Sequence, residues 1–513
     1  MAERRLVRAA LLLLALLAGL AHAVAVAAPW DGQPRWWLQL LALGVLAWLL
    51  ERSCGWQAAG IRAWLYAMAW LAGTFWWLFI SMHTYGGLAA PLAVLAVFAL
   101  SGALALYYAL AAVCYVRLRP APRMARALLF AALWLLAELA RARWFTGFGW
   151  GASGYAHVDG LLAGYAPWVG VHGIAFIAAW LAATMPQIWS CGHVQRIAVL
   201  AVLALPSVQQ MGQEGYTTAA GELPVRLLQG NIPQDEKFQP GSGVPTALRW
   251  YAEQLLDNSS ALVVAPETAI PLLPQQLPPA YWETLQARYA RGEQAALIGL
   301  PLGSRAQGYT NSAVGLAPGR TPWRYDKYHL VPFGEFIPPG FRWFTELMNI
   351  PLGDFARGPL GAPSFAWGGQ RLAPHICYED LFGEELAARF ADAAQAPTVF
   401  VNLSNIAWFG PTVAIDQHLQ IARMRALEFE RPFVRATNTG STAHIDHRGQ
   451  VVAELPRHTR GSLETVVQGR QGLTPYARWA AALGLWPLWM LGAGIVCTAA
   501  WVARRRPQAA SGP

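Results

Sequence analysis

The sequence predicts a polytopic α-helical membrane domain and one α/β domain that lies outside the cytoplasm. Two observations predict this fold class. Of the 513 residues, 55% are hydrophobic and only 13% are charged, whereas soluble domains have about 25% charged residues. Long charge-free runs also flank a segment in which strand-like and helix-like patterns alternate. The runs indicate membrane spans, and the alternation indicates an α/β domain between them.

Eight apolar runs are predicted to cross the membrane. A spanning helix needs about 20 predominantly apolar residues. Five runs reach that length, namely Ala9–Ala28, Ala63–Met82, Leu88–Val116, Leu161–Trp189 and Trp479–Val502. Three shorter runs complete the set, namely Trp36–Leu50, Ala127–Ala140 and Ile197–Met211.

The first run has an alternative interpretation as a cleavable signal peptide. It begins with Arg4, Arg5 and Arg8, continues through a Leu-rich stretch and ends in Ala-His-Ala. Signal peptides have this form. A first membrane span is the preferred interpretation, because the segments that follow keep returning to the membrane.

Basic residues set the predicted orientation, since loops rich in Lys and Arg stay in the cytoplasm. One assignment places these residues inside: Arg4, Arg5, Arg8, Arg52, Arg62, Arg117, Arg119, Arg123, Arg126, Arg196, Arg504, Arg505 and Arg506. Arg141 and Arg143 are its exceptions. The predicted domains are a membrane domain of about seven helices over 1–211, an extracytoplasmic domain over 223–468, a last helix over 479–503 and a cytoplasmic tail over 504–513.

The net charge of +9 then reflects topology and contact with anionic lipid headgroups. A nucleic-acid role is not supported, because the basic residues form no single face or motif.

The segment between the spans has the length and pattern of one α/β domain. Strands are predicted over 225–228, 261–265, 296–300, 311–316, 372–377, 398–403, 433–437 and 441–455, and helices over 245–257, 280–291 and 413–429. Arg448-Gly449 marks a hairpin turn. The sequence has no internal repeat, no phosphate-binding glycine loop and no cluster of metal ligands, so we expect no cofactor and no metal.

Three residues of this domain are candidates for catalysis. Glu267 and Cys377 each follow an apolar run, at the strand ends where open α/β sheets build sites. The other cysteines, Cys54, Cys114, Cys191 and Cys497, lie in or beside the apolar runs, so Cys377 has no disulfide partner in its domain. Lys327 is one of two lysines among 38 basic residues. Lys327 is therefore a candidate for a role that needs a compact ammonium rather than a planar guanidinium, and chance retention at a surface position stays open as the alternative.

A nucleophilic thiol needs a base and a positive charge near the oxyanion that forms after attack. Glu, Lys and Cys supply these roles, and the trio resembles the catalytic residues of the nitrilase superfamily. Five further segments resemble the apolipoprotein N-acyltransferase family of bacterial inner membranes: Gln229–Gln234, Lys327–Glu335, Ser404–Gly410, Gln417–Arg425 and Arg435–Gly440. That family surrounds a nitrilase-like α-β-β-α sandwich with eight spans, so the resemblance covers the whole chain.

The resemblance implies a role for each matching residue. Glu267 would be the general base, Cys377 the nucleophile, and Lys327 the group that stabilises the oxyanion and helps to hold Glu267. Glu335 matches the family's second essential Glu. Tyr378 and Glu379 match the residues beside the nucleophile, and the Tyr378 N–H would be a second oxyanion donor. Loop capping by Glu335 and core packing by Tyr378 stay open as alternatives.

The sequence departs from the family pattern at two positions. Phe238 stands where the family has a Trp on a mobile arm, so the apolar part of that role is kept and the indole N–H is lost. Ile406 replaces an Asp that often follows Ser-Asn in the family, so any hydrogen bond from that Asp is missing.

The implied activity is a ping-pong acyl transfer at the inner membrane. Phospholipid would donate an acyl chain to Cys377, and the N-terminal amine of diacylglyceryl-cysteine in an apolipoprotein would accept it in the periplasm, by a monomeric enzyme without nucleic acid. Two alternatives stay open: a membrane-tethered amidase or nitrilase that hydrolyses a small amide, and a non-catalytic lipid-binding or transport protein.

Overall fold

The computed structural model describes residues 2–185, 192–212, 215–338, 340–341 and 354–505. The chain divides into two compact units, which we call the helical unit and the α/β unit. The helical unit comprises Met1–Trp76, Val94–Gln213 and Leu485–Pro513, and the α/β unit comprises Trp77–Ala93 and Glu214–Gly484.

Long apolar helices build the helical unit. They are α1 Ala2–Val26, α2 Trp36–Glu51, α3 Trp56–Phe75, α4 Ala90–Leu118, α5 Arg123–Arg143, α6 Ala166–Thr184, α7 His193–Gly212 and α14 Trp486–Arg504. Helix α1 packs against α2 and α3, and α5 packs against α6 and α14. Within the described residues, four helices (α1, α4, α6 and α14) are long and apolar enough to cross a membrane by length and composition.

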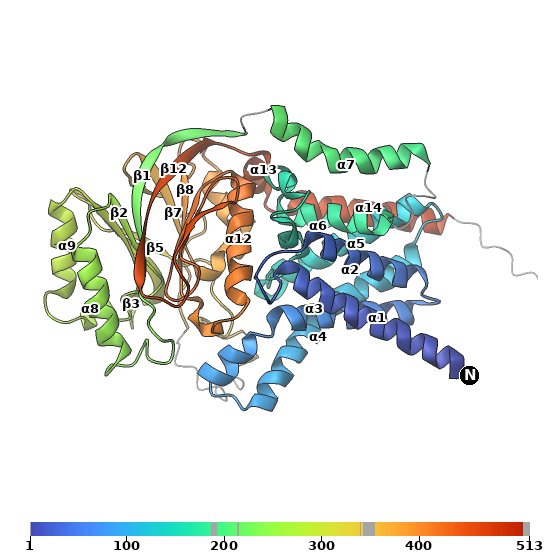
Figure 1. Ribbon diagram of the computed structural model, residues 1–513, viewed down its shortest axis with the longest axis horizontal. Helices are drawn as coiled ribbons and strands as arrows, with labels where there is room; N and C mark the ends of the chain where they lie inside the picture. The colour runs from blue at the N-terminus through green and yellow to red at the C-terminus, as the bar shows by residue number, and fades with distance from the viewer. Residues whose placement is uncertain (1, 186–191, 213–214, 339, 342–353, 506–513) are drawn as a thin grey trace, which may run out of the picture. The chain divides into compact units, whose positions relative to one another are not determined.

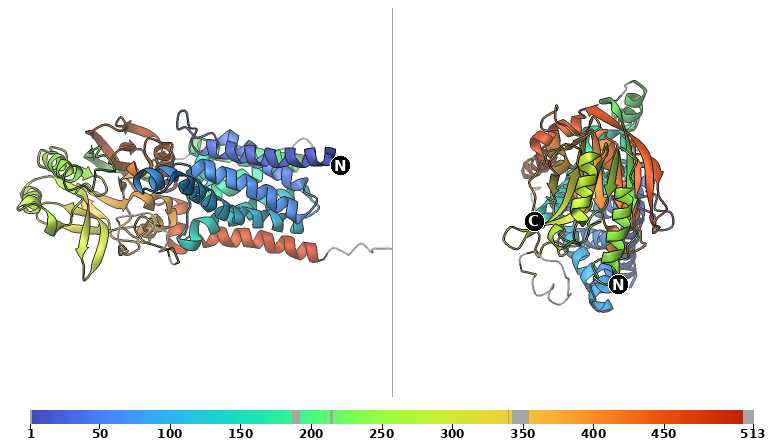
Figure 2. Two further views of the ribbon diagram at one scale, coloured as in Figure 1. Left: turned by 90° about the horizontal axis from the view of Figure 1, so that it is seen from below. Right: turned by 90° about the vertical axis from the view of Figure 1, so that its left-hand side faces the viewer.

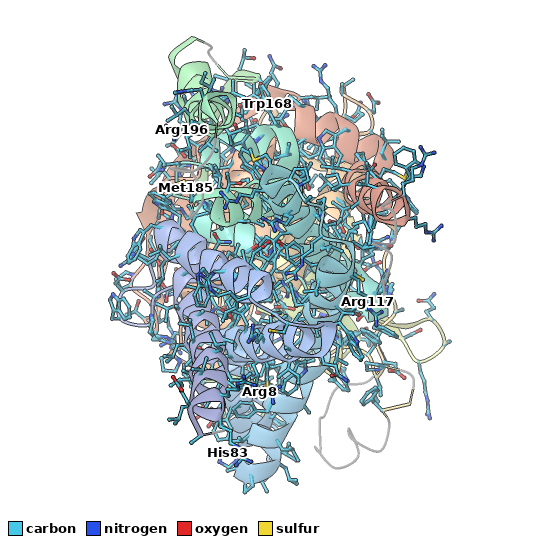
Figure 3. The ribbon with its side chains drawn as sticks, turned by 90° about the vertical axis from the view of Figure 1, so that its right-hand side faces the viewer. Arg8, His83, Arg117, Trp168, Met185 and Arg196 are labelled. Carbon is cyan, nitrogen blue, oxygen red and sulfur yellow. The ribbon has the colours of Figure 1, made fainter. Side chains whose placement is uncertain are left out.

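Arginines gather where the helices of this unit turn. Arg62 donates to the Leu49 carbonyl at 2.9 Å, Arg126 pairs with Glu51 at 3.1 Å, and Arg119 donates to the Glu51 carbonyl at 3.1 Å. The α2–α3 and α4–α5 turns therefore lie together. Figure 3 views the structure from the side on which α1 begins and labels Arg8, Arg117 and Arg196 of α1, α4 and α7.

Two buried charged residues of α5 fix the loop that leads to α6. Glu138 accepts hydrogen bonds from the Ser153 N–H at 2.9 Å and from the Ser153 hydroxyl at 2.7 Å. Arg141 donates to the carbonyls of Phe148 at 2.6 Å and Trp150 at 2.7 Å. Ionisable groups inside an apolar bundle need such partners, which also explains why Arg141 does not follow the pattern of the basic loops.

The predicted run Ala63–Met82 does not form one helix. Helix α3 ends at Phe75, and the next segment belongs to the α/β unit. There the Trp77 indole donates to Gln417 at 3.0 Å, and its ring lies 4.2 Å from the Phe409 ring. An apolar run shows that side chains avoid water, but it does not tell whether lipid or a protein core surrounds them.

The predicted run Trp479–Val502 also divides in two. Its first residues lie in α13 (Pro475–Leu483), whose Tyr476, Ala477 and Ala480 are buried in the core of the α/β unit. Gly484, with φ of 56°, ends α13 in a conformation that favours glycine, and α14 begins two residues later. The end of the predicted run Leu161–Trp189, after residue 185, and the tail beyond residue 505 lie outside the described residues.

Two six-stranded sheets form the centre of the α/β unit. Their orders are β12-β1-β2-β3-β4-β5 and β11-β10-β9-β8-β7-β6. The strands are β1 Thr217–Gln229, β2 Leu262–Ala265, β3 Ala295–Ser304, β4 Gly308–Leu316, β5 Trp323–Asp326, β6 Phe365–Trp367, β7 Gln370–Ile376, β8 Val399–Ser404, β9 Phe433–Thr437, β10 Ala443–Ile445, β11 Val451–Glu454 and β12 Gly461–Gly472. Strands β1, β2 and β3 are parallel in the first sheet, as are β7, β8 and β9 in the second.

The sheets pack face to face between two helical layers (Figures 1 and 2). A core of Val, Leu and Ala side chains from both sheets fills the space between them. A second core lies between the first sheet and helices α8 (Gly243–Leu256) and α9 (Tyr281–Arg291). A third lies between the second sheet and α12 (Ala414–Phe429), with α13. The α-β-β-α sandwich is therefore present, and its strands extend from Thr217 to Gly472.

Candidate active site

Glu267 lies two residues after the carboxyl end of β2, a buried strand in the interior of the first sheet. Its carboxylate accepts a hydrogen bond from the Asn311 amide at 2.7 Å and another from the Asn405 N–H at 2.8 Å. The carboxylate is therefore held by one donor from β4 and one from the residue after β8, so both sheets fix its orientation.

Lys327 follows β5, and its N–H donates to the Asn311 carbonyl at 2.9 Å. Its amine lies 3.0 and 2.9 Å from the two carboxylate oxygens of Glu335 and 3.5 Å from Glu267 Oε1. Burial alone would lower the pKa of Lys327, but the carboxylates of Glu335 and Glu267 more than offset burial and hold the pKa above its usual range. The lysine is thus a permanent cation.

Asn311 joins the two carboxylates. Its amide group donates to Glu267 at 2.7 Å and to Glu335 at 2.7 Å. Glu335 also accepts from the Val331 N–H at 2.8 Å, so it closes the turn that follows Lys327 as well as pairing with the amine. Glu335 therefore caps the turn and also pairs with the Lys327 amine, so the capping and catalytic interpretations do not exclude each other.

Cys377 stands directly after β7 and has a backbone φ of 51°. Side-chain-bearing residues rarely adopt this conformation, and it is found where a site needs it. The Cys377 carbonyl accepts from the Asn402 amide at 3.1 Å and lies 3.3 Å from His418 Nε2. Burial, followed by the Glu267 charge, raises the pKa of the Cys377 thiol to about 12, so the resting group is a thiol that needs a base.

Glu379 braces the two segments that carry the amine and the thiol. Its carboxylate accepts from the Ile376 N–H at 2.6 Å, the Tyr328 N–H at 2.7 Å and the Tyr325 hydroxyl at 2.7 Å. Burial raises the pKa of Glu379 despite these donors. Glu379 therefore connects β7 to the loop after Lys327.

Tyr378 and Phe238 lie at the margins of this arrangement. The Tyr378 ring is buried, 5.3 Å from Phe382 and 5.7 Å from His329, so its side chain packs in an aromatic cluster. Phe238 is 38% exposed on the loop before α8. Ile406, at the family's Asp position, is buried, and a Cβ on Gly440 would lie 2.5 Å from its Cγ2.

A buried network next to Cys377, formed by Asp380, His418 and Arg435, is not predicted from the sequence. Arg435, which can only donate, contacts His418 Nδ1 at 2.8 Å. The proton of the imidazole is therefore on Nε2, which donates to Asp380 at 3.0 Å. His418 and Arg435 belong to segments that carried the family resemblance, and their shared contact could have been sought there.

We expect His418→Leu to lower the free energy of unfolding by about 3–5 kcal/mol, because it leaves a carboxylate and a guanidinium buried without their common partner. Thermal unfolding in detergent would measure the loss. The control is His447→Leu, since His447 is only partly buried in the β10–β11 turn. Equal melting temperatures for the two variants would show that the network does not stabilise the fold.

Among the described residues, no group of three or more His, Cys, Asp or Glu side chains is arranged to hold a metal ion. The site instead combines a buried thiol, a carboxylate with two fixed donors and a permanent cation. This combination suits attack by sulfur on a carbonyl carbon, with the carboxylate as proton acceptor and the cation near the developing oxyanion.

Comparisons with known proteins agree with this chemistry. Residues 18–184 match the model of the apolipoprotein N-acyltransferase N-terminal domain, and residues 225–475 match that of carbon-nitrogen hydrolases. The apolipoprotein N-acyltransferase of Verminephrobacter eiseniae is 58% identical over 497 residues, which cover 92% of each chain. That of Ralstonia nicotianae is 45% identical over 96% of this chain and 93% of its own.

Among solved structures, a CN-hydrolase superfamily protein of Xanthomonas campestris aligns with 48% of this chain and 91% of its own, with 21% identity and a TM-score of 0.38. The family assignment depends on the two family models and the curated relatives. The chain belongs to the apolipoprotein N-acyltransferase family, with a carbon-nitrogen hydrolase domain built on two sheets.

Proposed function

We propose that this protein transfers an acyl chain from a membrane phospholipid, through a thioester on Cys377, to the N-terminal amine of diacylglyceryl-cysteine in apolipoproteins. The observation that carries the proposal is the placement of Glu267, Lys327 and Glu335 in one hydrogen-bonded group, in which the charges of Glu267 and Lys327 act on the Cys377 thiol. The relatives named above bear the name of this activity.

In the first half-reaction, the Cys377 thiol attacks the sn-1 ester carbonyl of the phospholipid. Glu267 takes the thiol proton as the sulfur–carbon bond forms, since the thiol pKa of about 12 leaves little thiolate beforehand. Lys327 and the Tyr378 N–H stabilise the oxyanion. When the oxyanion collapses, the ester C–O bond breaks, Glu267 returns the proton to the leaving oxygen, and lysophospholipid departs.

In the second half-reaction, the neutral amine of the apolipoprotein attacks the thioester carbon. A C–N bond forms, the C–S bond breaks, and Glu267 passes one amine proton to the sulfur. Glu335 keeps Lys327 oriented throughout, and Glu379 keeps the Lys327 loop against the Cys377 turn. Exclusion of water from the thioester would favour the amine over hydrolysis.

The function also implies a place in the cell. We infer eight membrane spans, both termini in the cytoplasm and the α/β domain, with approximate bounds 223–468, in the periplasm of a bacterial inner membrane. Support comes from the apolar helices and from the arginines at their turns. A single-chain enzyme anchored in this way meets both lipid-anchored substrates in the bilayer.

The function is tested with purified protein, phospholipid vesicles and a diacylglyceryl-cysteine peptide. We expect lysophospholipid release to continue only while peptide is present, and the peptide to gain one acyl chain by mass. Release that continues with water as acceptor would indicate a hydrolase instead. Absence of both products would indicate a non-catalytic lipid-binding protein.

The topology makes a separate prediction. Reporter fusions after Gln468 and at the C-terminal end should report opposite compartments, because α14 lies between them. Fusions that report the same compartment would show that α14 does not cross the membrane.

A further inference from the structure

The second lysine of the chain, Lys237, is buried beside the proposed site. Its side chain is 2% exposed, and its amine donates to the backbone carbonyl of Glu267 at 3.0 Å. In the part of the chain that the structure describes, this amine has no carboxylate partner within ion-pair distance. A buried ammonium without such a partner is costly, so a purely structural hydrogen bond would be an expensive use of it.

The loop that carries Lys237 is itself fixed to the site. The Lys237 N–H donates to the Pro233 carbonyl at 2.9 Å. Gln234 accepts from the Asn405 amide at 2.9 Å, and the Asn405 N–H donates to the Glu267 carboxylate at 2.8 Å. The loop therefore reaches Glu267 twice, once through its backbone carbonyl and once through its carboxylate, and it ends in the exposed Phe238.

The charges that act on the Lys237 amine are those of the site. Burial lowers the pKa of Lys237 to about 7, while the Glu267 carboxylate and the charge of Cys377 in its thiolate form oppose that effect. Lys327, the other cation, is shared between two carboxylates at 2.9 and 3.5 Å. Two carboxylates and a developing thiolate therefore share Lys327, which is already paired, and Arg435, which is bound to His418. Lys237 supplies a further cation next to Glu267.

We propose that Lys237 is a positioning residue of the acyl-transfer site, which fixes the Glu267 backbone and supplies the positive charge that balances the Cys377 thiolate. The inference rests on the proposed function and deepens it. The charge matters most when the thiolate leaves the acyl group in the second half-reaction, because no bond to carbon then shares the negative charge of the sulfur. Phe238 follows Lys237 directly and is 38% exposed, so the same loop also carries an exposed apolar side chain.

The test measures the reactivity of the Cys377 thiol with N-ethylmaleimide against pH, in the full-length protein in detergent. Mass spectrometry of the Cys377 peptide separates it from the other cysteines. This readout needs neither phospholipid nor apolipoprotein, so it distinguishes failure of the inference from failure of the proposed function. Other charged groups that act on Cys377 are Glu267, Lys327, Asp380 and Arg435, and the His418 ring lies at the Cys377 carbonyl. All variants keep these groups.

Three variants separate charge from hydrogen bonding. Lys237→Gln keeps a donor without charge, Lys237→Met removes both, and Lys237→Arg keeps both. We expect the Gln and Met variants to react about tenfold more slowly than the unchanged protein at about pH 6, the effect of one pKa unit on the thiolate. The difference should vanish by about pH 9, because the amine of the unchanged protein loses its charge above its pKa of about 7.

Lys237→Arg should recover most of the reactivity at low pH, and Arg249→Gln, on the exposed face of α8, should change nothing. A Gln variant with the pH profile of the unchanged protein would overturn the proposal, as would a loss of equal size at every pH. If Lys237→Met does not fold, the thiol reactivities of Lys237→Gln and Lys237→Arg at about pH 6 still test whether the charge of residue 237 is required.

Discussion

Glu267→Gln is expected to abolish thioester formation while leaving the protein folded. A glutamine amide fills the same space, but it cannot accept the proton of a thiol whose pKa is raised to about 12. The loss of a general base typically costs about 10²–10⁴ in rate. The measurement is the initial rate of Cys377 acylation from phospholipid vesicles.

The control for this variant is Glu283→Gln, which removes an exposed carboxylate from the first turn of α9. Its rate should equal that of the unchanged protein. If Glu267→Gln at an unchanged melting temperature kept a rate within about threefold of the control, far from the loss expected of a base, the carboxylate would not be the proton acceptor.

Lys327→Arg should also nearly abolish acylation, although it preserves the charge. The amine sits between Glu335 at 2.9 Å and Glu267 at 3.5 Å, and its side chain is 1% exposed. A planar guanidinium is wider and would move the charge away from the oxyanion. Removing one oxyanion donor typically costs about 10²–10³ in rate.

The rate of thioester formation at matched expression and melting temperature is the appropriate measurement. Arg249→Lys, the reverse exchange at an exposed position of α8, serves as control. Nearly full activity in Lys327→Arg would reduce Lys327 to a structural cation.

The predicted strands and helices of the α/β unit correspond to observed elements, because their apolar runs and turn residues are local signals. Two predicted ends of membrane spans, at Met82 and at Trp479, differ from the ends of the observed helices. Trp77 and Ala480 pack in the α/β unit, and hydrophobicity alone does not separate protein interior from lipid. The break between α13 and α14 at Gly484 depends on a positive backbone φ. Hydropathy does not report this angle, so the apolar run reads as continuous.

The predicted trio depended on residue chemistry and family resemblance, whereas its supporting residues depend on the fold. Asn311 is 44 positions from Glu267, and nothing in the local sequence indicates that they meet. The Tyr378 ring packs on Phe382, a contact that the sequence does not indicate, and the oxyanion role of the Tyr378 N–H stays a prediction. Lys237, like Lys327, is a lysine kept among arginines, but its hydrogen bond to the Glu267 carbonyl depends on the fold.

The most direct test of the central claim is the intact mass of the protein after incubation with phospholipid alone. We expect one added acyl chain, located on the Cys377 peptide and removed by neutral hydroxylamine, as a thioester requires. Transfer of that chain to a diacylglyceryl-cysteine peptide should follow when the peptide is added. An acyl adduct that persists in Cys377→Ala, or that survives hydroxylamine, would contradict the assignment of Cys377 as the nucleophile.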